Sequence, residues 1–229
     1  MSQSSLGTAS RTALVVGANR GIGLSLCKRF KVKGREVIAA GRRSSSALDA
    51  LGARVELGVD VTDDASVAAL AKRLEGVVLD ELVCNAGILH EDDLDNVHLD
   101  DVRMQIEVNA LGPLRVVKAL RKNIRRGGKL ALITSRMGSI GDNGSGGYYG
   151  YRMSKAALNA AGMSLARDLR GAGVAVAILH PGFVRTDMTA QTGSVDPDDA
   201  AKQLVERIDA LSLETSGTFW HANGQVLPW

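Results

Sequence analysis

The sequence predicts a single α/β domain in which helices cover both faces of a doubly wound, mostly parallel, seven-stranded sheet. Three observations support this fold class. Short apolar segments, several rich in β-branched residues, alternate along the chain with segments of helical periodicity. The connections between them are short and no linker interrupts them, which is typical of parallel strands joined by helices. With 229 residues, 45% of them hydrophobic, the chain can bury the core of one such domain.

Composition argues against several other kinds of protein. The net charge of +3 is small and no basic segment is interleaved with aromatic residues, so we expect no nucleic-acid partner. No apolar segment approaches the ~18 residues of a membrane span. Residues 1–10 are polar and rich in serine, which predicts a disordered tail rather than a signal peptide, followed by one domain over residues 11–229. We therefore expect a cytoplasmic protein with no membrane partner.

Cys27 and Cys84 lie inside apolar segments without metal-ligand spacing, so we expect buried reduced thiols and no metal site.

The first strand is predicted at residues 12–16 and leads through a glycine-rich turn into a helix over 22–30. The turn reads Gly17-Ala-Asn-Arg-Gly-Ile-Gly23. Unpaired N–H groups and partial positive charge at a helix N-terminus suit a pyrophosphate. The spacing differs from the Gly-x-Gly-x-x-Gly dinucleotide pattern, but we predict the same role; a plain tight turn is the alternative. The candidate cofactor-binding residues here are Gly17, Asn19, Arg20, Gly21, Ile22 and Gly23.

The end of the second strand, predicted at 36–40, indicates which dinucleotide would bind. In dinucleotide-binding folds this position lies near the adenosine ribose, where an acidic residue binds the 2′-hydroxyl and an arginine accommodates a 2′-phosphate. No acid is present, and Arg42 and Arg43 follow the strand. Arg20 could join Arg42 in the same anion site. We therefore predict NADP(H) rather than NAD(H), with solvated surface arginines as the alternative.

The third and fourth strands are predicted at 54–61 and 79–83, with a helix over 65–74 between them. Asp60 lies at the end of the third strand, and the fourth leads directly into Asn85-Ala86-Gly87. Ligands of open parallel sheets bind in the crevice outside the carboxyl ends of the strands. The Asn-Ala-Gly turn is therefore a candidate for the cofactor site, although it could be an ordinary exit from a strand.

A long helix is predicted at 101–120, after an acidic loop over 90–100. It contains Asn109 among apolar residues, and such an amide must find hydrogen bonds or cost stability. A satisfied structural asparagine and a functional one are equally compatible with this pattern. Pro113 predicts a kink or a break in the helical hydrogen bonds just before it.

The fifth strand, predicted at 129–135, places Ser135 at its carboxyl end. A glycine-rich loop over 138–150 then leads to a helix that contains Tyr151 and Lys155, one turn apart on one face. A nearby ammonium favours the ionised form of a phenol and would lower its pKa from ~10. Such a tyrosine could exchange a proton with a carbonyl or alcohol oxygen near neutral pH. Taken alone, however, most helical Tyr/Lys pairs only cover a surface.

The sixth strand is predicted at 174–179 and is followed by Pro181-Gly182. The polar segment 189–195 is a candidate substrate lid. A last helix is predicted over 196–211, and a short closing strand and tail follow it.

Together these parts resemble the short-chain dehydrogenase/reductase family over residues 11 to 229. Parallel strands place the motifs at one edge of the sheet, and their order is that of the family. The similarity is greatest to the C-factor-like and sniffer-type carbonyl reductases, on the stretches Gly17-Ala-Asn-Arg-Gly, Ser135-Arg-Met-Gly-Ser-Ile140 and Gly224-Gln-Val-Leu-Pro-Trp229. The interval from Ser135 to Tyr151 is longer than in many members of the family.

The resemblance implies a single-domain Rossmann fold that carries both cofactor and catalytic residues. Tyr151 would be the general acid or base, Lys155 would lower its pKa and hold the nicotinamide ribose, and Ser135 would bind the substrate oxygen. Asn109 would keep a water in a proton relay to Lys155. The remaining implied cofactor-binding residues are Arg42, Asp60, Val61, Asn85, Ala86, Gly87, Pro181, Gly182, Val184 and Thr186, with Tyr151 and Lys155 contributing as well.

We therefore expect an NADP(H)-dependent oxidoreductase that acts on a small aldehyde, ketone, quinone or alcohol. The alternative is an NADP-binding signalling or sensor protein of C-factor-like type with little turnover. Alanines on the Tyr151 helix would allow a homodimer or homotetramer, but packing on the sheet explains them equally well. Apolar candidates for the substrate pocket are Met137, Tyr148, Tyr149, Phe183, Met188 and Trp229.

Overall fold

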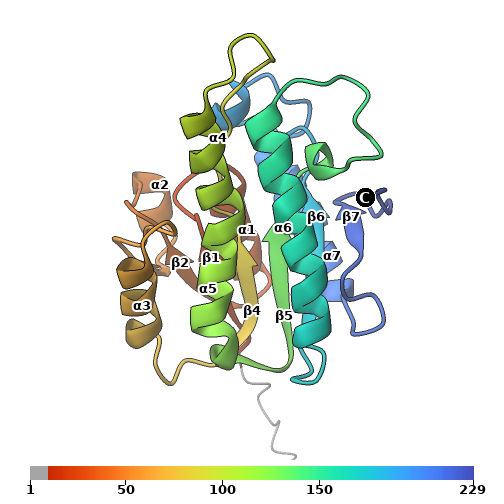
Figure 1. Ribbon diagram of the computed structural model, residues 1–229. Helices are drawn as coiled ribbons and strands as arrows, with labels where there is room; N and C mark the ends of the chain where they lie inside the picture. The colour runs from red at the N-terminus through yellow and green to blue at the C-terminus, as the bar shows by residue number, and fades with distance from the viewer. Residues whose placement is uncertain (1–9) are drawn as a thin grey trace, which may run out of the picture.

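A computed structural model describes residues 10–229 and shows one seven-stranded sheet between two layers of helices (Figure 1). The tail predicted at residues 1–10 lies almost entirely outside the described residues. The strand order is β3-β2-β1-β4-β5-β6-β7, and all six pairings are parallel. The order reverses between β1 and β4, which is the switch point where doubly wound sheets bind ligands. The predicted fold class is confirmed.

Short apolar segments form the strands, and the periodic segments between them form the helices. The strands are β1 (Thr12–Val16), β2 (Glu36–Ala40), β3 (Arg54–Glu56), β4 (Leu79–Cys84), β5 (Ile124–Ile133), β6 (Ala175–His180) and β7 (Phe219–His221). The helices are α1 (Gly21–Val32), α2 (Ser46–Asp49), α3 (Asp64–Arg73), α4 (Leu99–Ile106), α5 (Gly112–Leu120), α6 (Tyr149–Asp168) and α7 (Pro197–Ala210).

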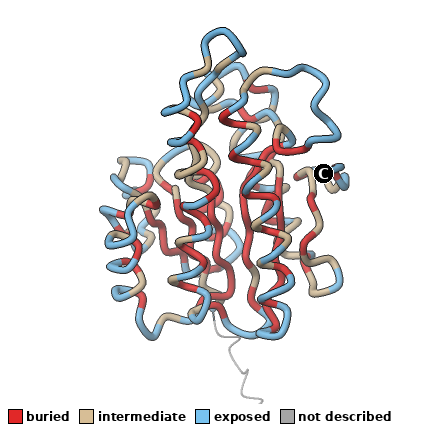
Figure 2. Tube along the Cα trace, in the orientation of Figure 1, coloured by how far each residue is buried: buried red, intermediate tan, exposed pale blue. Residues whose placement is uncertain are grey.

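Each central strand is buried on both faces, which explains its continuous apolar sequence. In β1, Leu14 and Val16 face the core under α3, α5 and α6, whereas Ala13 and Val15 face the core under α1 and α7. Figure 2 shows burial concentrated in the strands and in the helix faces that cover them. Cys27 and Cys84 are free and buried, as expected. No helix within residues 10–229 is long and apolar enough to cross a membrane.

The long helix predicted at 101–120 is interrupted as Pro113 predicts. It consists of α4, a π-helical turn over Glu107–Leu111 and then α5, whose first turn contains the proline. Because proline has no N–H, the hydrogen bond that would close the preceding turn cannot form, and a wider turn replaces it. Asn109 lies in the middle of this π-helical turn.

Two strand boundaries differ from the prediction for non-local reasons, and one short helix was not predicted. β3 ends at Glu56 rather than at Val61, because the chain turns there and the Val59 N–H donates to the Gly41 carbonyl. β5 begins at Ile124, where it pairs with Leu79 of β4. The short helix α2 is capped by a side chain that accepts from its first turn, a local signal that apolar periodicity does not reveal.

Candidate active site

The polar motifs predicted from the sequence meet at the carboxyl edge of the sheet. The glycine turn follows β1, Asn85 follows β4, Ser135 follows β5 and Pro181-Gly182 follows β6. Tyr151 lies in the first turn of α6 at this same edge. Because all strands are parallel, their carboxyl ends point to one side and bring these segments together (Figure 1).

The glycine turn forms a cradle in which side chains would not fit. Gly17 and Gly21 have φ of +87° and +51°. A methyl group on Gly23 would lie 1.9 Å from the Gly17 carbonyl oxygen and 2.7 Å from Asn85 Nδ2. The Asn85 amide donates to that same carbonyl oxygen at 2.7 Å, so it joins the end of β4 to the turn after β1. Neither a capping side chain nor an acidic residue occupies the first turn of α1, whose N–H groups therefore suit an anionic ligand.

Contacts at Ala86 and Asn19 hold the glycine turn in place. A methyl group on Gly17 would lie 2.5 Å from the Ala86 nitrogen, so the two backbones touch. The Asn19 carbonyl accepts the Ser45 hydroxyl at 2.7 Å, which fixes the turn against the start of α2. Ile22 packs against the core beneath α1.

Asp60, after β3, is held in place by its own loop. Its carboxylate accepts the Thr62 N–H at 2.9 Å and the Thr62 hydroxyl at 2.8 Å. These bonds lower the pKa of Asp60, and the nearby charges of Arg42 and Arg115 lower it further. Arg42 is exposed, and within residues 10–229 it forms no ion pair.

Arg20 pairs with an acidic residue in the protein without a cofactor, and its place beside Arg42 in an anion site stays a prediction. Its guanidinium forms an ion pair with Asp187 at 2.6 Å, across the cleft from the glycine turn to the segment after β6. The pair is solvent-exposed on both sides, with side-chain exposures of 69% and 59%, so it contributes little to stability. Asp187 was not singled out from the sequence, because nothing local relates it to a residue so far away.

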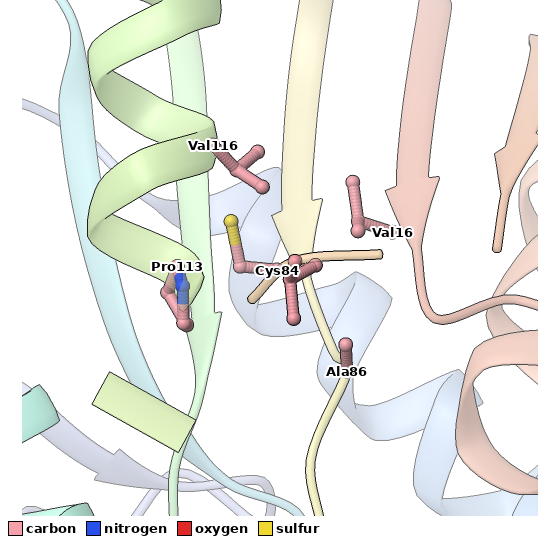
Figure 3. Close-up of a pocket in the computed structure, with 6 residues that line it drawn as sticks. Val16, Cys84, Ala86, Pro113 and Val116 are labelled. Atoms are coloured by element: carbon pink, nitrogen blue, oxygen red, sulfur yellow. The ribbon is translucent and has the colours of Figure 1, made fainter. Parts of the chain in front are cut away.

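A small apolar pocket opens beside this part of the site (Figure 3). It lies at the carboxyl ends of β1 and β4, is too narrow for a water molecule, and has the predicted cofactor residues Val61 and Ala86 in its lining. The residues that line it are Val16, Val61, Cys84, Ala86, Pro113 and Val116. A methyl group on Gly112 would lie 2.8 Å from Val61, so α5 packs closely against the pocket wall.

Asn109 is completely buried, and its amide braces the loop after β4. Its Nδ2 donates to the Ile88 carbonyl at 2.8 Å and to the Ser154 hydroxyl at 2.9 Å, while its Oδ1 accepts the Ile88 N–H at 2.8 Å. Both amide N–H groups are therefore used. The side-chain amide of Asn109 is thus fully hydrogen-bonded within the protein. Its predicted part in a water relay stays a prediction and would use Oδ1 or the backbone. A methyl group on Gly87 would lie 3.1 Å from Asn109 Oδ1 and 3.6 Å from Lys155 Nζ.

Tyr151 and Lys155 are both buried, with 7% and 4% of their surface exposed. The Lys155 ammonium lies 5.7 Å from the centre of the Tyr151 ring and donates to the Ile133 carbonyl at 3.1 Å. Burial raises the pKa of Tyr151 to about 12, although a hydrogen bond with the Ser135 hydroxyl lowers it in part. Burial also lowers the pKa of Lys155 to about 8.

The pKa of Tyr151 is therefore raised in the protein without a cofactor, and its lowering by Lys155 stays a prediction for the protein with its cofactor bound. Dehydration favours the neutral form of both groups. At neutral pH Tyr151 keeps its proton, which is the state needed to donate one.

Ser135 is close to Tyr151 despite the long interval between them. It caps the 3-10 turn Arg136–Gly138 by accepting the Met137 N–H at 3.1 Å. Gly138 then lies directly against the backbone of Lys155, where a methyl group would come within 2.7 Å of the carbonyl carbon. The extra residues form a loop beyond this contact and do not displace the serine.

The segment after β6 lies against the glycine turn. Gly182 has a φ of +93°, and Val184 pairs with Val195, so the candidate lid at 189–195 returns to the sheet edge. A methyl group on Gly21 would lie 3.2 Å from the Thr186 side chain. Thr186 also forms a capping box with Thr189. Pro181 is buried at the end of β6.

No group of three or more His, Cys, Asp or Glu side chains that could hold a metal ion occurs within residues 10–229. The site consists instead of a glycine cradle, an exposed arginine and a buried Ser/Tyr/Lys set. The cradle is suited to a dinucleotide, and the buried set is suited to proton exchange with an oxygen atom.

Comparison with known proteins identifies the class. The family model for short chain dehydrogenases matches residues 11–196, and the chain belongs to this family of oxidoreductases. It is 46% identical over 224 residues to 1-hydroxy-2-glutathionyl-2-methyl-3-butene dehydrogenase from Rhodococcus sp. (strain AD45), with 95% of this chain and 99% of the relative covered. It is 42% identical over 154 residues to C-signal from Myxococcus xanthus, with 66% of this chain and 93% of the relative covered.

Solved structures agree with this assignment. A short-chain dehydrogenase/reductase from Burkholderia multivorans with bound NADP has a TM-score of 0.89 at 33% identity, covering 96% of this chain and 100% of that one. Carbonyl reductase Sniffer of D. melanogaster has a TM-score of 0.89 at 27% identity, with the same coverage. The Rossmann-like fold and the likeness to C-signal and Sniffer relatives predicted from the sequence are confirmed.

Proposed function

We propose that the protein is an NADP(H)-dependent oxidoreductase that transfers a hydride between the nicotinamide and a small carbonyl or alcohol substrate. The observation that carries this proposal is the buried set of Ser135, Tyr151 and Lys155, which lies at the same sheet edge as the glycine cradle. A dinucleotide in the cradle would extend toward Pro181-Gly182 and bring its reactive end to this set.

The residues of the cleft fit the two ends of NADP(H). The N–H groups at the start of α1 would hold the pyrophosphate, and Asp60 and Val61, on the loop after β3, would contact the adenine. Arg42 is exposed near Asp60 and would pair with the 2′-phosphate. Val184 and Thr186 would face the nicotinamide side. A related structure carries bound NADP, which supports this choice.

When bound, the cofactor supplies or accepts the hydride. The Ser135 hydroxyl would hold the substrate oxygen beside Tyr151, and Tyr151 would donate its proton to that oxygen as the carbonyl becomes an alcohol. The high pKa of the phenol keeps this proton available at neutral pH. Lys155 would hold the nicotinamide ribose and supply the positive charge that stabilises the phenolate left behind. Asn109 would keep Ile88 and Gly87 in place beside them.

The test is consumption of NADPH, followed by its absorbance, with a panel of aldehydes, ketones and quinones. Tyr151→Phe removes only the phenolic hydroxyl and should reduce kcat by at least about 100-fold, the contribution typical of a general acid. Ser164→Ala is the matched control, since it removes an exposed hydroxyl group from the same helix. Unchanged turnover in Tyr151→Phe would exclude the mechanism.

A second candidate reaction is oxidation of an alcohol that carries a glutathionyl group. The relative that is 46% identical over almost the full length of both chains is named for such a substrate. Reduction of NADP+ and NAD+ should be measured with glutathione conjugates of small hydroxylated alkenes and with the same alcohols lacking glutathione. A requirement for the glutathionyl group would favour this substrate class over simple carbonyls.

The likeness to C-signal keeps an NADP-binding signalling role as the alternative function. Tight cofactor binding without turnover on any substrate tested would favour that role. The complete Asn109, Ser135, Tyr151 and Lys155 set favours chemistry instead.

A further inference from the structure

The helix that carries Tyr151 begins with a strained residue. Tyr148, immediately before α6, has a φ of +53° and no side-chain hydrogen bond that caps the helix. A bulky residue rarely adopts this left-handed conformation, and surrounding contacts must maintain it. The first N–H groups of the helix also need partners from outside it.

Asp92 supplies those partners from a distant part of the chain. Its backbone carbonyl accepts the Tyr148 N–H at 2.7 Å. Its carboxylate accepts the next two N–H groups, that of Tyr149 on Oδ1 and that of Gly150 on Oδ2 at 3.2 Å. One residue therefore binds three successive N–H groups, and Tyr151 follows directly after them.

The loop that presents Asp92 is itself anchored to the π-helical region. The Ile88 backbone is held by Asn109, and the His90 N–H donates to Gln105 at 3.0 Å. Gln105 is completely buried, and a methyl group on Gly150 would lie 2.3 Å from its Nε2. The loop and the start of α6 are thus fixed against the same buried side chain.

This loop also connects the two halves of the site. It begins with the Asn85-Ala86-Gly87 turn, which touches the glycine cradle, and it ends at Asp92 on the N-terminus of the Tyr151 helix. We propose that Asp92 is a positioning residue, which sets the distance between the cofactor-binding turn and the Tyr151 hydroxyl. This inference rests on the proposed function, in which Tyr151 is the proton donor.

Two substitutions at Asp92 separate positioning from general stability. Asp92→Ala removes both side-chain bonds, whereas Asp92→Asn keeps one acceptor oxygen, and asparagine is about as good a cap as aspartate. We expect kcat to fall about tenfold or more in Asp92→Ala and by a smaller factor in Asp92→Asn, because a displacement of about 1 Å in a catalytic group can cost a hundredfold. The dissociation constant for NADPH, measured by fluorescence titration, should change by less than about twofold, because the glycine cradle is intact.

Amide hydrogen exchange gives a readout independent of activity. Exchange at Tyr149 and Gly150 should accelerate in Asp92→Ala, while exchange in the central strands β1 and β4 stays unchanged. Asp100→Asn is the matched control, since that carboxylate belongs to the next helix, has 95% of its side chain exposed and pairs only with Arg103. It should leave kcat and exchange unchanged.

Two results would overturn the proposal. The first is a kcat for Asp92→Ala equal to that of the parent despite faster exchange at Tyr149 and Gly150. The second is that, in both Asp92→Ala and Asp92→Asn, NADPH affinity and the protection of strand amides from exchange fall in proportion to kcat. That result would make Asp92 a general stabiliser of the fold. Failure of the proposed function is recognised separately, by full activity of Tyr151→Phe.

Discussion

Lys155 should make the cofactor-free protein less stable below about pH 8 than above it. The pKa of this lysine falls from 10.5 to about 8 because its ammonium is buried. The unfolded chain therefore keeps a proton that the folded protein loses between about pH 8 and 10.5. In that window the unfolded state binds more protons, so stability rises with pH, and below it the destabilisation is present in full.

The size of this effect follows from the shift. A difference of 10.5 − 8 ≈ 2.5 units corresponds to about 3 kcal/mol at 1.36 kcal/mol per unit. Between pH 8 and about pH 9.5 the gain is about 2 kcal/mol. Tyr151 acts in the opposite direction, since its pKa is raised to about 12, but its effect begins only above about pH 10.

Lys155→Met isolates this contribution, because methionine fills a similar volume without a charge. Urea unfolding of both proteins without cofactor, at about pH 7 and about pH 9.5, should show the parent gaining about 2 kcal/mol relative to the variant. Lys129 and the buried cysteines titrate in both proteins, so they cancel in the difference. Lys122→Met, at an exposed position, is the control. Parallel stability profiles for parent and Lys155→Met would refute dehydration of this lysine.

Three further outcomes are expected. Gly23→Ala should abolish NADPH-induced thermal stabilisation, because its methyl group would overlap the Gly17 carbonyl oxygen. Arg42→Asp should weaken NADPH binding by at least about tenfold and leave NADH binding within about twofold, because it removes a charge-assisted bond to the 2′-phosphate only. Glu81→Ala should lower the free energy of unfolding by about 2 kcal/mol, because Glu81 is fully buried and its loss would leave Arg35, only 3% exposed, with Asp209 as its remaining partner.

Each of these outcomes has a matched control and a contradicting result. Gly144→Ala has open space around it and should leave the thermal shift intact; a normal shift in the Gly23 variant would contradict the cradle. Lys122→Asp, which changes the charge at an exposed site away from Arg42, is the control for Arg42→Asp. Equal losses of affinity for NADH and NADPH in Arg42→Asp would contradict recognition of the 2′-phosphate. Glu75→Ala is the exposed control for Glu81, and a variant of Glu81 as stable as the parent would contradict the buried ion pair.

Local residue patterns were sufficient where a structural feature depends on residue type and spacing. The glycine turn requires positive φ at Gly17, the break before Pro113 follows from its missing N–H, and Tyr151 and Lys155 share a face because they are one turn apart. The boundaries of β3 and β5 were predicted less well, since they depend on which distant strand supplies the hydrogen bonds.

By itself, therefore, the sequence determined the fold class, the order of the motifs and the edge of the sheet at which they meet. Only the tertiary structure decided which partners they have there. Asp92 caps α6 from 57 residues away, and Arg20 pairs with Asp187 across 167 residues, so no local pattern relates either pair. The same holds for the protonation of Tyr151 and Lys155, because a pKa responds to the surrounding burial and charge, and both arise only when the chain is folded.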